Sequence, residues 1–233
     1  MRQTDQLRNP PPLYGHCRQD TGVQVFRDFL SRFLGARPAA PQPGEVSNPV
    51  PEHFTLHGIP VTVLNSRPDV ETAQAMSRLS DALALISVYA PRRLRHMRHD
   101  FARVWVQRFP CRAAYYPEPR ACLIELTFLV NPRHTAAEVA ASLVHEAVHA
   151  RLARAGVHAG VDGKAREERL CREAELEFGL AIPGGEGVVE RARESLLLSD
   201  SEVAPTIDWS VAARRVAEVD VVAGRRSGQG NQG

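Results

Sequence analysis

The sequence predicts one α+β domain in which a small mixed or antiparallel sheet packs on a buried helix and on further C-terminal helices. Segments rich in β-branched and aromatic residues, typical of strands, fall between about residues 54 and 130. The segment of about 135–156 has a helical pattern that is apolar nearly all round, which is typical of a helix at a domain centre. The later segments have helical periodicity. The 233 residues suffice for one such domain with extensions.

Composition and charge narrow the class of protein. Apolar residues make up 43% and charged residues 24% of the chain, which is ordinary for a soluble protein, and the net charge of +2 gives no sign of a nucleic-acid partner. No apolar run approaches the ~18 residues of a membrane span, and the first residues lack the apolar core of a signal peptide. The four cysteines have no C-x-x-C spacing, so we expect reduced thiols in a cytoplasmic protein. A disulfide between Cys111 and Cys122 is the less favoured alternative.

The first part of the chain, residues 1–52, is expected to lie outside the folded domain. Residues 1–21 are polar and proline-rich, which predicts disorder, and prolines between 36 and 52 predict an extended linker. Between them, residues 23–34 form a predicted short amphipathic helix, with apolar side chains at helical spacing: Phe26, Phe29, Leu30, Phe33 and Leu34. This helix either docks on the domain or contacts a membrane surface or a partner.

The folded body is expected to begin near residue 53. Residues 54–64 predict one or two short strands around Gly58. A helix is predicted over 69–88, with Asp69 as its cap and an apolar face formed by Ala73, Met76, Leu79, Leu83 and Ile86. A short helix over 91–98 and strands over 101–107 and 111–116 follow. Residues 121–130 give the strongest strand signal of the chain.

The helices of the second half have clear sequence boundaries. Thr135 and Glu138 form a predicted capping box, which begins a helix that ends near Gly156. The next helix is predicted over 164–180 and is stopped by the Pro-Gly-Gly sequence of 183–185. Further helices are expected over about 186–198 and 207–219. The low-complexity residues 221–233 predict a flexible tail.

The most informative motif is H-E-x-x-H, formed by His145, Glu146 and His149. Positions i and i+4 of a helix share a face, so both imidazoles can reach one metal ion. Apolar residues cover most of this helix, and the motif residues form most of its one polar stripe. Two histidines and a glutamate that are buried together need partners, because an unpaired buried polar group costs several kcal/mol. A metal ion supplies such a partner.

A third ligand is expected on the following helix. Glu168 follows His149 with 18 residues between them, and three glycines in this segment allow a loop to return the second helix onto the first. Glu168, Cys171 and Glu175 are predicted along the edge of an apolar face formed by Leu170, Ala174, Phe178 and Ala181. Glu175 is the alternative ligand, or a hydrogen-bond partner of a ligating histidine. Glu167 is the nearest competitor, while Glu173 and Glu177 are predicted to face solvent.

The pattern H-E-x-x-H-x18-E resembles that of the gluzincin zinc metallopeptidases, and the small body resembles compact bacterial zincin domains such as those of stress-regulator peptidases. The resemblance covers about residues 100–183 and implies a zincin-like fold over 53–220. It implies one Zn²⁺ held by His145, His149 and Glu168. In that family a strand at the cleft edge pairs with extended peptide substrate, a role that would fall to residues 121–130 here.

The resemblance implies hydrolysis of peptide bonds by metal-activated water, with Glu146 as the general base and a peptide or protein as substrate. The oxyanion needs a further donor, for which Tyr115, Tyr116, His134 and His158 are candidates. The two tyrosines are adjacent, so in a strand they face opposite sides, and packing is the favoured role of each.

Two other functions compete with the peptidase. A zincin-like regulatory or binding module would hold the metal with little or no peptidase activity, its cleft blocked for example by the N-terminal segment. That segment could instead be a substrate or an inhibitory pro-region. A structural helical domain with a chance motif is the third alternative. The intact Glu146 favours the enzyme, because metal binding alone does not need that residue.

Overall fold

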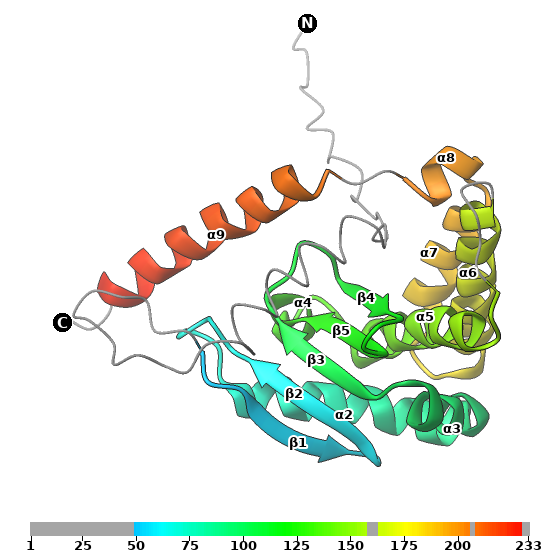
Figure 1. Cartoon of the computed structure of the whole chain (residues 1–233), viewed down its shortest axis with the longest axis horizontal. Helices are drawn as coiled ribbons and strands as arrows, with labels where there is room; N and C mark the ends of the chain where they lie inside the picture. The colour runs from blue at the N-terminus through cyan, green and yellow to red at the C-terminus, as the bar shows by residue number, and fades with distance from the viewer. Residues whose placement is uncertain (1–48, 158–162, 206–207, 230–233) are drawn as a thin grey trace, which may run out of the picture.

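The computed structural model describes residues 49–157, 163–205 and 208–229. The predicted helix over 23–34, and with it the membrane or partner contact, lies outside these residues, as do Cys17 and His158. The described chain combines a mixed sheet with helices, as the sequence predicts (Figure 1).

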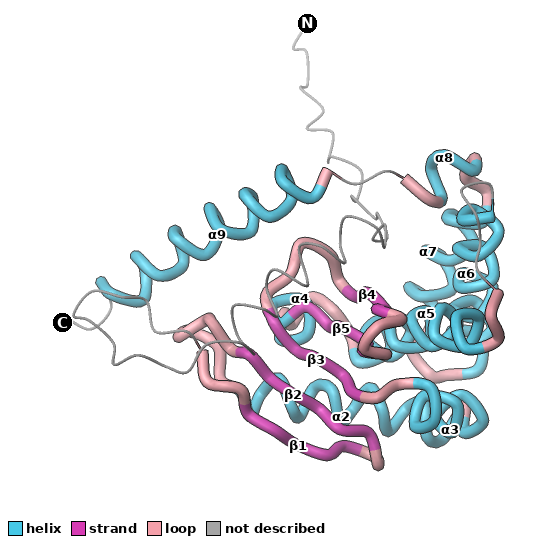
Figure 2. The backbone as a smooth tube through the Cα atoms, viewed as in Figure 1, coloured by secondary structure: helices cyan, strands magenta, loops and turns pink. Residues whose placement is uncertain are grey.

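The sheet has five strands in the described residues, in the order β1-β2-β3-β5-β4. Its strands are β1 (Glu52–Leu56), β2 (Ile59–Leu64), β3 (Arg103–Gln107), β4 (Ala113–Tyr116) and β5 (Ala121–Glu125). The central pairs β2–β3 and β3–β5 are parallel, and the outer pairs β1–β2 and β4–β5 are antiparallel. The sheet is therefore mixed, and β4 is an edge strand that runs against its neighbour (Figure 2).

A two-residue turn joins the first two strands. His57 and Gly58 both have positive φ, 49° and 77° respectively, which matches the tight hairpin turns that suit twisted strands. The alternative of two strands around Gly58 is thus confirmed. Successive side chains of a strand point to opposite faces of the sheet, and both faces carry apolar residues. The main core takes Val61 and Val63 from β2 together with Cys122 and Ile124 from β5, whereas a smaller cluster lies on the other face, formed by Trp105, Phe109, Ala114, Tyr116, Ala121 and Leu123.

The first two described helices link β2 to β3. Helix α2 (Thr72–Tyr89) buries Met76, Leu79, Leu83 and Ile86 as predicted, but Ala73 is exposed. The predicted cap is also wrong. Glu71 is the N-cap of α2, and Asp69 pairs with Arg67 instead. Helix α3 (Pro91–Asp100) begins at its proline, whose fixed φ suits a first helical position.

The strand predicted over 121–130 is only half as long as expected. Residues 126–130 form the short helix α4 (Leu126–Val130), whose first turn is capped by Glu125 through a hydrogen bond from the Phe128 backbone amide. Strand β5 lies between β3 and β4, so it is not the edge of the sheet. The prediction that 121–130 forms an edge strand is therefore wrong, and the edge strands of the described sheet are β1 and β4.

Five further helices follow in the described residues, namely α5 (Ala136–Arg154), α6 (Lys164–Ala181), α7 (Glu186–Leu196), α8 (Asp200–Val203) and α9 (Trp209–Gln229). Helix α5 packs against α2, α3, α6 and β4, so it lies at the centre of the domain. Helix α6 contacts α5 on one side and α7 on the other. The helix expected over 207–219 extends to Gln229, into the segment that was predicted to be a tail.

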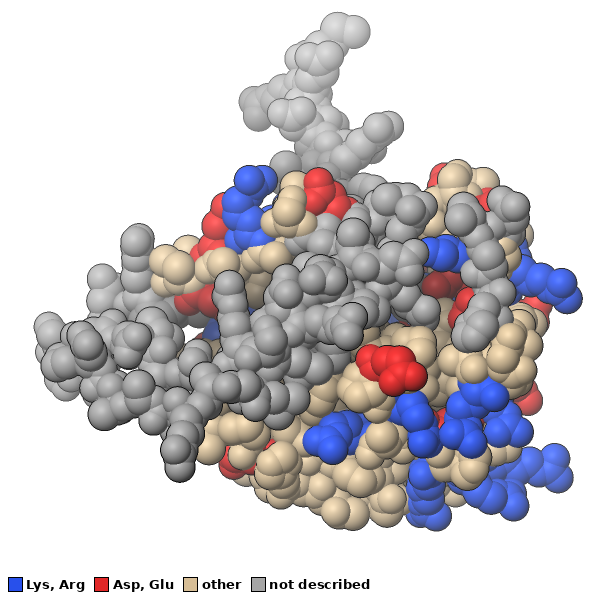
Figure 3. Space-filling model, in the orientation of Figure 1, with Lys and Arg blue, Asp and Glu red and all other residues tan. Residues whose placement is uncertain are grey.

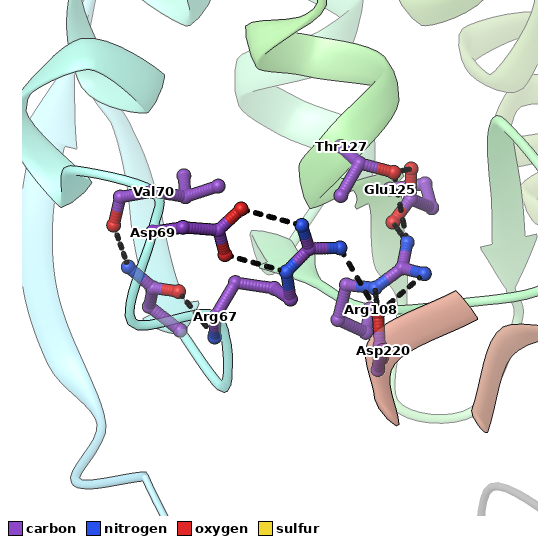
Figure 4. Close-up of polar contacts among 8 residues, drawn as sticks. Arg67, Asp69, Val70, Arg108, Glu125, Thr127 and Asp220 are labelled. Atoms are coloured by element: carbon purple, nitrogen blue, oxygen red, sulfur yellow. Dashed lines mark hydrogen bonds and ion pairs between the residues drawn. The ribbon is translucent and has the colours of Figure 1, made fainter. Parts of the chain in front are cut away.

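An arginine network, formed by Arg67, Asp69, Arg108, Glu125 and Asp220, ties α9 to the sheet (Figure 4). Arg108 follows β3 and pairs with Glu125 at the end of β5 and with Asp220 of α9. Arg67 holds Asp69 and also reaches Asp220, at 3.0 Å. The side chains of Arg108 and Glu125 are 10% and 7% exposed, whereas those of Asp69 and Asp220 are 35% and 28% exposed. The network therefore reaches from a nearly buried ion pair to the surface, and each of its charges has an opposite charge beside it.

The surface of α3 is basic. Arg92, Arg95 and Arg98 are exposed on it, and arginine side chains gather over this helix in the space-filling view (Figure 3). Cysteines 111, 122 and 171 are free thiols, so the alternative of a disulfide between the first two is not realised. Within the described ranges, no helix combines the length and the apolar character that crossing a bilayer requires.

Candidate metal centre

Helix α5 holds the H-E-x-x-H motif at the centre of the domain. Its first turn is fixed by the predicted capping box, in which Glu138 N–H donates to Thr135 Oγ1 at 3.2 Å and Thr135 N–H donates to Glu138 Oε2 at 2.9 Å. The helix is buried on several sides, and its buried apolar residues are Ala137, Val139, Ala140, Ala141, Leu143, Val144, Ala147 and Ala150. His145 and Glu146 are buried with them, which confirms that the motif lies on a central helix.

Helix α6 faces the motif with a polar side, which corrects the predicted orientation in part, because Ala174 and Phe178 are buried as predicted. Leu170 and Ala181 were assigned to its buried face, yet both are exposed. The buried residues are instead Glu168, Cys171, Arg172, Ala174, Glu175, Phe178 and Gly179. The predicted edge is thus the face that α6 turns toward α5. Glu173 and Glu177 point to solvent, as predicted.

Three ligand types converge between α5 and α6. The Nε2 atoms of His145 and His149 lie 3.1 Å apart. A carboxylate oxygen of Glu168 lies 3.3 Å from the first of them, and the other oxygen lies 3.5 Å from the second. Cys171 Sγ lies 3.5 Å from His149 Nε2. We call these four residues together with Glu146 the histidine cluster.

The opposite ring nitrogen of each histidine meets a carboxylate. His145 Nδ1 lies 2.7 Å from Glu175 Oε1, and His149 Nδ1 lies 2.8 Å from Glu167 Oε1. An ionised carboxylate only accepts hydrogen bonds, so each Nδ1 must carry the proton. In the neutral imidazole this leaves the lone pair on Nε2, where it points into the cluster. Carboxylates placed in this way orient histidines that ligate a metal.

Burial and neighbouring charged groups shift the pKa values of the residues in and around the cluster. Burial raises the pKa of Glu175, but His145, Arg172 and Arg191 outweigh it and hold that pKa at about 2, so this carboxylate is ionised. Burial raises the pKa of Glu146, while the two imidazoles act in the opposite direction. Burial lowers the pKa of both histidines, but the acidic groups around them raise it well above the usual value. The site therefore favours positive charge at its centre.

The structure brings every ligand candidate of the sequence analysis to one place. His145, His149 and Glu168 face one another, and Glu175 and Glu167 contact the histidines from behind. Cys171 was not expected as a ligand. Its position one helical turn after Glu168 was the available signal, because residues at i and i+3 share a helix face. His145, His149 and Cys171 alone form a group that could hold a metal ion, with ligand atoms within 4.8 Å of one another.

The described candidates for an oxyanion donor lie in packed positions. Tyr115 belongs to the main core and its ring centroid lies 6.0 Å from that of Phe101. Tyr116 belongs to the cluster on the other face of the sheet, so the two rings point to opposite sides as predicted. His134 lies at the start of α5, beside Glu138, with Nδ1 3.4 Å from its carboxylate.

The chain was compared with protein-family models, with curated proteins and with solved structures, and no significant match was found. The resemblance to gluzincins therefore rests on the motif residues alone. The fold and the site together define an α+β protein with a buried candidate metal centre between two helices.

Proposed function

We propose that the protein is a zinc-dependent peptidase, with His145, His149 and Glu168 as metal ligands. The observation that carries the proposal is the convergence of two Nε2 atoms, 3.1 Å apart, on the Glu168 carboxylate, which lies 3.3 Å from one and 3.5 Å from the other. In a tetrahedral zinc site with bonds of about 2.0–2.1 Å, such ligand atoms are separated by about 3.3 Å. The spacing of the three groups thus fits this metal.

The charge of the site also fits a cation. The two Nε2 atoms lie 3.1 Å apart beside the Glu168 carboxylate, and the acidic groups around the imidazoles favour a positive charge at that point. Each histidine is oriented by a carboxylate on its far side, as expected for a ligand rather than for a histidine in a packing role. Nitrogen and oxygen donors together suit zinc, whereas magnesium and calcium sites use oxygen donors.

The chemistry assigned to the site is proton transfer by Glu146. A bound zinc ion lowers the pKa of a coordinated water toward neutrality and polarises the carbonyl group of a substrate. Glu146 lies between the two histidines in sequence and is buried beside them, so its carboxylate can accept the proton of the attacking water. The same carboxylate can then donate that proton to the amine that leaves when the peptide bond breaks.

Strand β4 is the proposed place for substrate. It lies at the end of the sheet order, runs antiparallel to β5, and contacts the motif helix α5. A peptide that extends such an edge gains backbone hydrogen bonds without requiring a particular sequence. This assigns the substrate-binding role to residues 113–116.

Metal analysis of the purified protein tests the centre directly. We expect near-stoichiometric zinc in the wild type and in Glu146→Gln, and loss of the metal in His145→Ala. A chelator-sensitive cleavage assay on unfolded casein then tests the reaction, and Glu146→Gln should be inactive although it holds zinc. A wild-type protein without bound metal would refute the centre, and a zinc-loaded protein without cleavage would refute the peptidase.

A zincin-like regulatory or binding module is the second candidate, and Cys171 favours it. Sites that serve only structure have four protein ligands, whereas catalytic sites keep one position for water. Cys171 Sγ lies 3.5 Å from His149 Nε2, so it can act as a fourth protein ligand. The cleavage assay separates this module from the peptidase.

A further inference from the structure

Cys171 has the geometry of a metal ligand. With a Zn–S bond of about 2.3 Å and Zn–N bonds of about 2.05 Å, a tetrahedral site separates sulfur from nitrogen by about 3.6 Å. The observed distance between Cys171 Sγ and His149 Nε2 is 3.5 Å. The thiol therefore fits the same centre as the imidazoles, at the separation expected for a fourth ligand.

The thiol is also held in place. Cys171 is fully buried and follows Glu168 by three residues on α6, so both side chains project from one face of that helix. Helix α6 packs on α5 along the motif, and this packing fixes the distance between the thiol and the imidazoles. Cys122 provides a contrast. It is equally buried but lies on β5 in the sheet core, where burial raises the pKa of its thiol well above the usual value.

A fourth protein ligand has a direct consequence for water. Four ligands saturate a tetrahedral zinc ion, whereas catalysis needs one exchangeable position. His145, His149 and Glu168 leave that position open, and Cys171 is placed to fill it. The same residues can therefore form a closed four-ligand state and an open three-ligand state, which differ only in whether the thiolate is bound.

We propose that the Cys171 thiolate is the fourth ligand of the resting centre and that its release from the metal opens the site to water and substrate. This inference rests on the metal centre proposed above. It assigns the protein a latent state that is built into helix α6. Binding requires the deprotonated thiol, so closing the site releases one proton to solvent.

Cobalt substitution tests the ligand without using activity. Cobalt(II) is added to metal-free wild type, Cys171→Ala and Cys111→Ala, and the absorption spectra are recorded. We expect a near-ultraviolet charge-transfer band from thiolate to cobalt in wild type and in the Cys111→Ala control, and its loss in Cys171→Ala. Cobalt affinity should fall by at least the roughly 10–100-fold that loss of a supporting partner costs. A cobalt-loaded wild type without this band overturns the proposal and leaves the centre standing.

Azide tests whether the position is closed. It should change the visible cobalt spectrum of Cys171→Ala, whose fourth position is open, and leave that of wild type unchanged. An equal response in both proteins overturns the closed resting state. Wild type that binds no cobalt overturns the thiolate ligand and the metal centre together. The band without peptidase activity in either protein supports Cys171 as a ligand and refutes the proposed reaction.

Discussion

Two polar clusters of this protein differ in how their charges are balanced. The arginine network surrounds Arg108 with Glu125 and Asp220 and joins Arg67 to Asp69 and Asp220, so guanidinium groups supplied by the chain neutralise its carboxylates. In the histidine cluster, carboxylates lie on both sides of each imidazole, and a thiol joins them. In the first cluster guanidinium groups lie beside the carboxylates, whereas His145, His149 and Cys171 in the second form a group that could hold a metal ion.

The contrast supports a structural role for the arginine network and the proposed metal-binding role for the histidine cluster. A guanidinium group carries its charge permanently and forms planar, paired hydrogen bonds, which suits a fixed connection between α9 and the sheet. Imidazole and thiol groups can give up a proton and offer a lone pair to a metal. Removing charges from the two clusters should therefore have different effects.

Metal removal is expected to give the largest effect, and only on the histidine cluster. At a free zinc concentration about 1,000 times the dissociation constant, binding stabilises the folded state by about 4 kcal/mol. Chelation should therefore lower the melting temperature of the wild type by roughly 10 °C. Calorimetry with and without chelator measures the shift, and His145→Ala should show none. An equal shift in both proteins would contradict a metal at this site.

Loss of the central guanidinium should destabilise the arginine network. Arg108→Met leaves Glu125 buried without its ion pair, which is expected to cost about 3 kcal/mol of the free energy of unfolding. Chemical denaturation gives this value, and Arg95→Met on the exposed surface of α3 serves as the control. Zinc stoichiometry should be unchanged. A variant that loses zinc while it stays folded would show that the two clusters are coupled.

The carboxylate behind His145 should affect metal affinity more than folding. Glu175→Gln removes the charge that orients the imidazole, so we expect zinc affinity to fall roughly 10–100-fold. Competition with a chromophoric chelator measures the change. The matched control is Glu173→Gln, which is exposed on the same helix and should bind zinc like the wild type. Equal affinities in both variants would remove Glu175 from the metal centre.

The smallest effect is expected at the outer end of the arginine network. The Asp220 side chain is 28% exposed, so Asp220→Asn should lower the free energy of unfolding by at most about 1 kcal/mol, because ion pairs near solvent contribute little. Urea denaturation of this variant beside Arg108→Met gives the comparison. A loss as large as that of Arg108→Met would mean that α9 contributes to the core of the domain.

Local sequence signals predicted most of the helix starts and ends. The capping box of Thr135 and Glu138 begins α5, Pro91 begins α3, and the Pro-Gly-Gly sequence at 183–185 follows the end of α6. These signals depend on interactions within a few residues of the chain, so they can be recognised without knowledge of the tertiary structure. The length of β5 did not follow from such signals. Apolar β-formers continue to residue 130, but the Glu125 side chain caps a helical turn at Phe128.

The orientation of α6 shows that the periodicity of apolar residues does not always predict which face of a helix is buried. Leu170 was expected inside, yet it is 40% exposed, whereas Glu168, which was predicted on the edge of that face, is buried. Apolar periodicity assumes that a helix buries its apolar side. Here the neighbouring helix carries two histidines and a glutamate, so a polar face is the matching partner. The same reorientation brings Cys171 to the cluster.

One chain sufficed to predict the motif helix, its capped start, its apolar surroundings and the four ligand candidates His145, His149, Glu168 and Glu175. Helical spacing sets these features, and spacing can be read from one chain. Three features follow only from the fold: β4 rather than β5 lies at an edge of the sheet, Glu175 and Glu167 contact the imidazoles, and Cys171 faces His149. These features depend on how α6 and the strands pack against α5, and such contacts join residues that are distant in sequence.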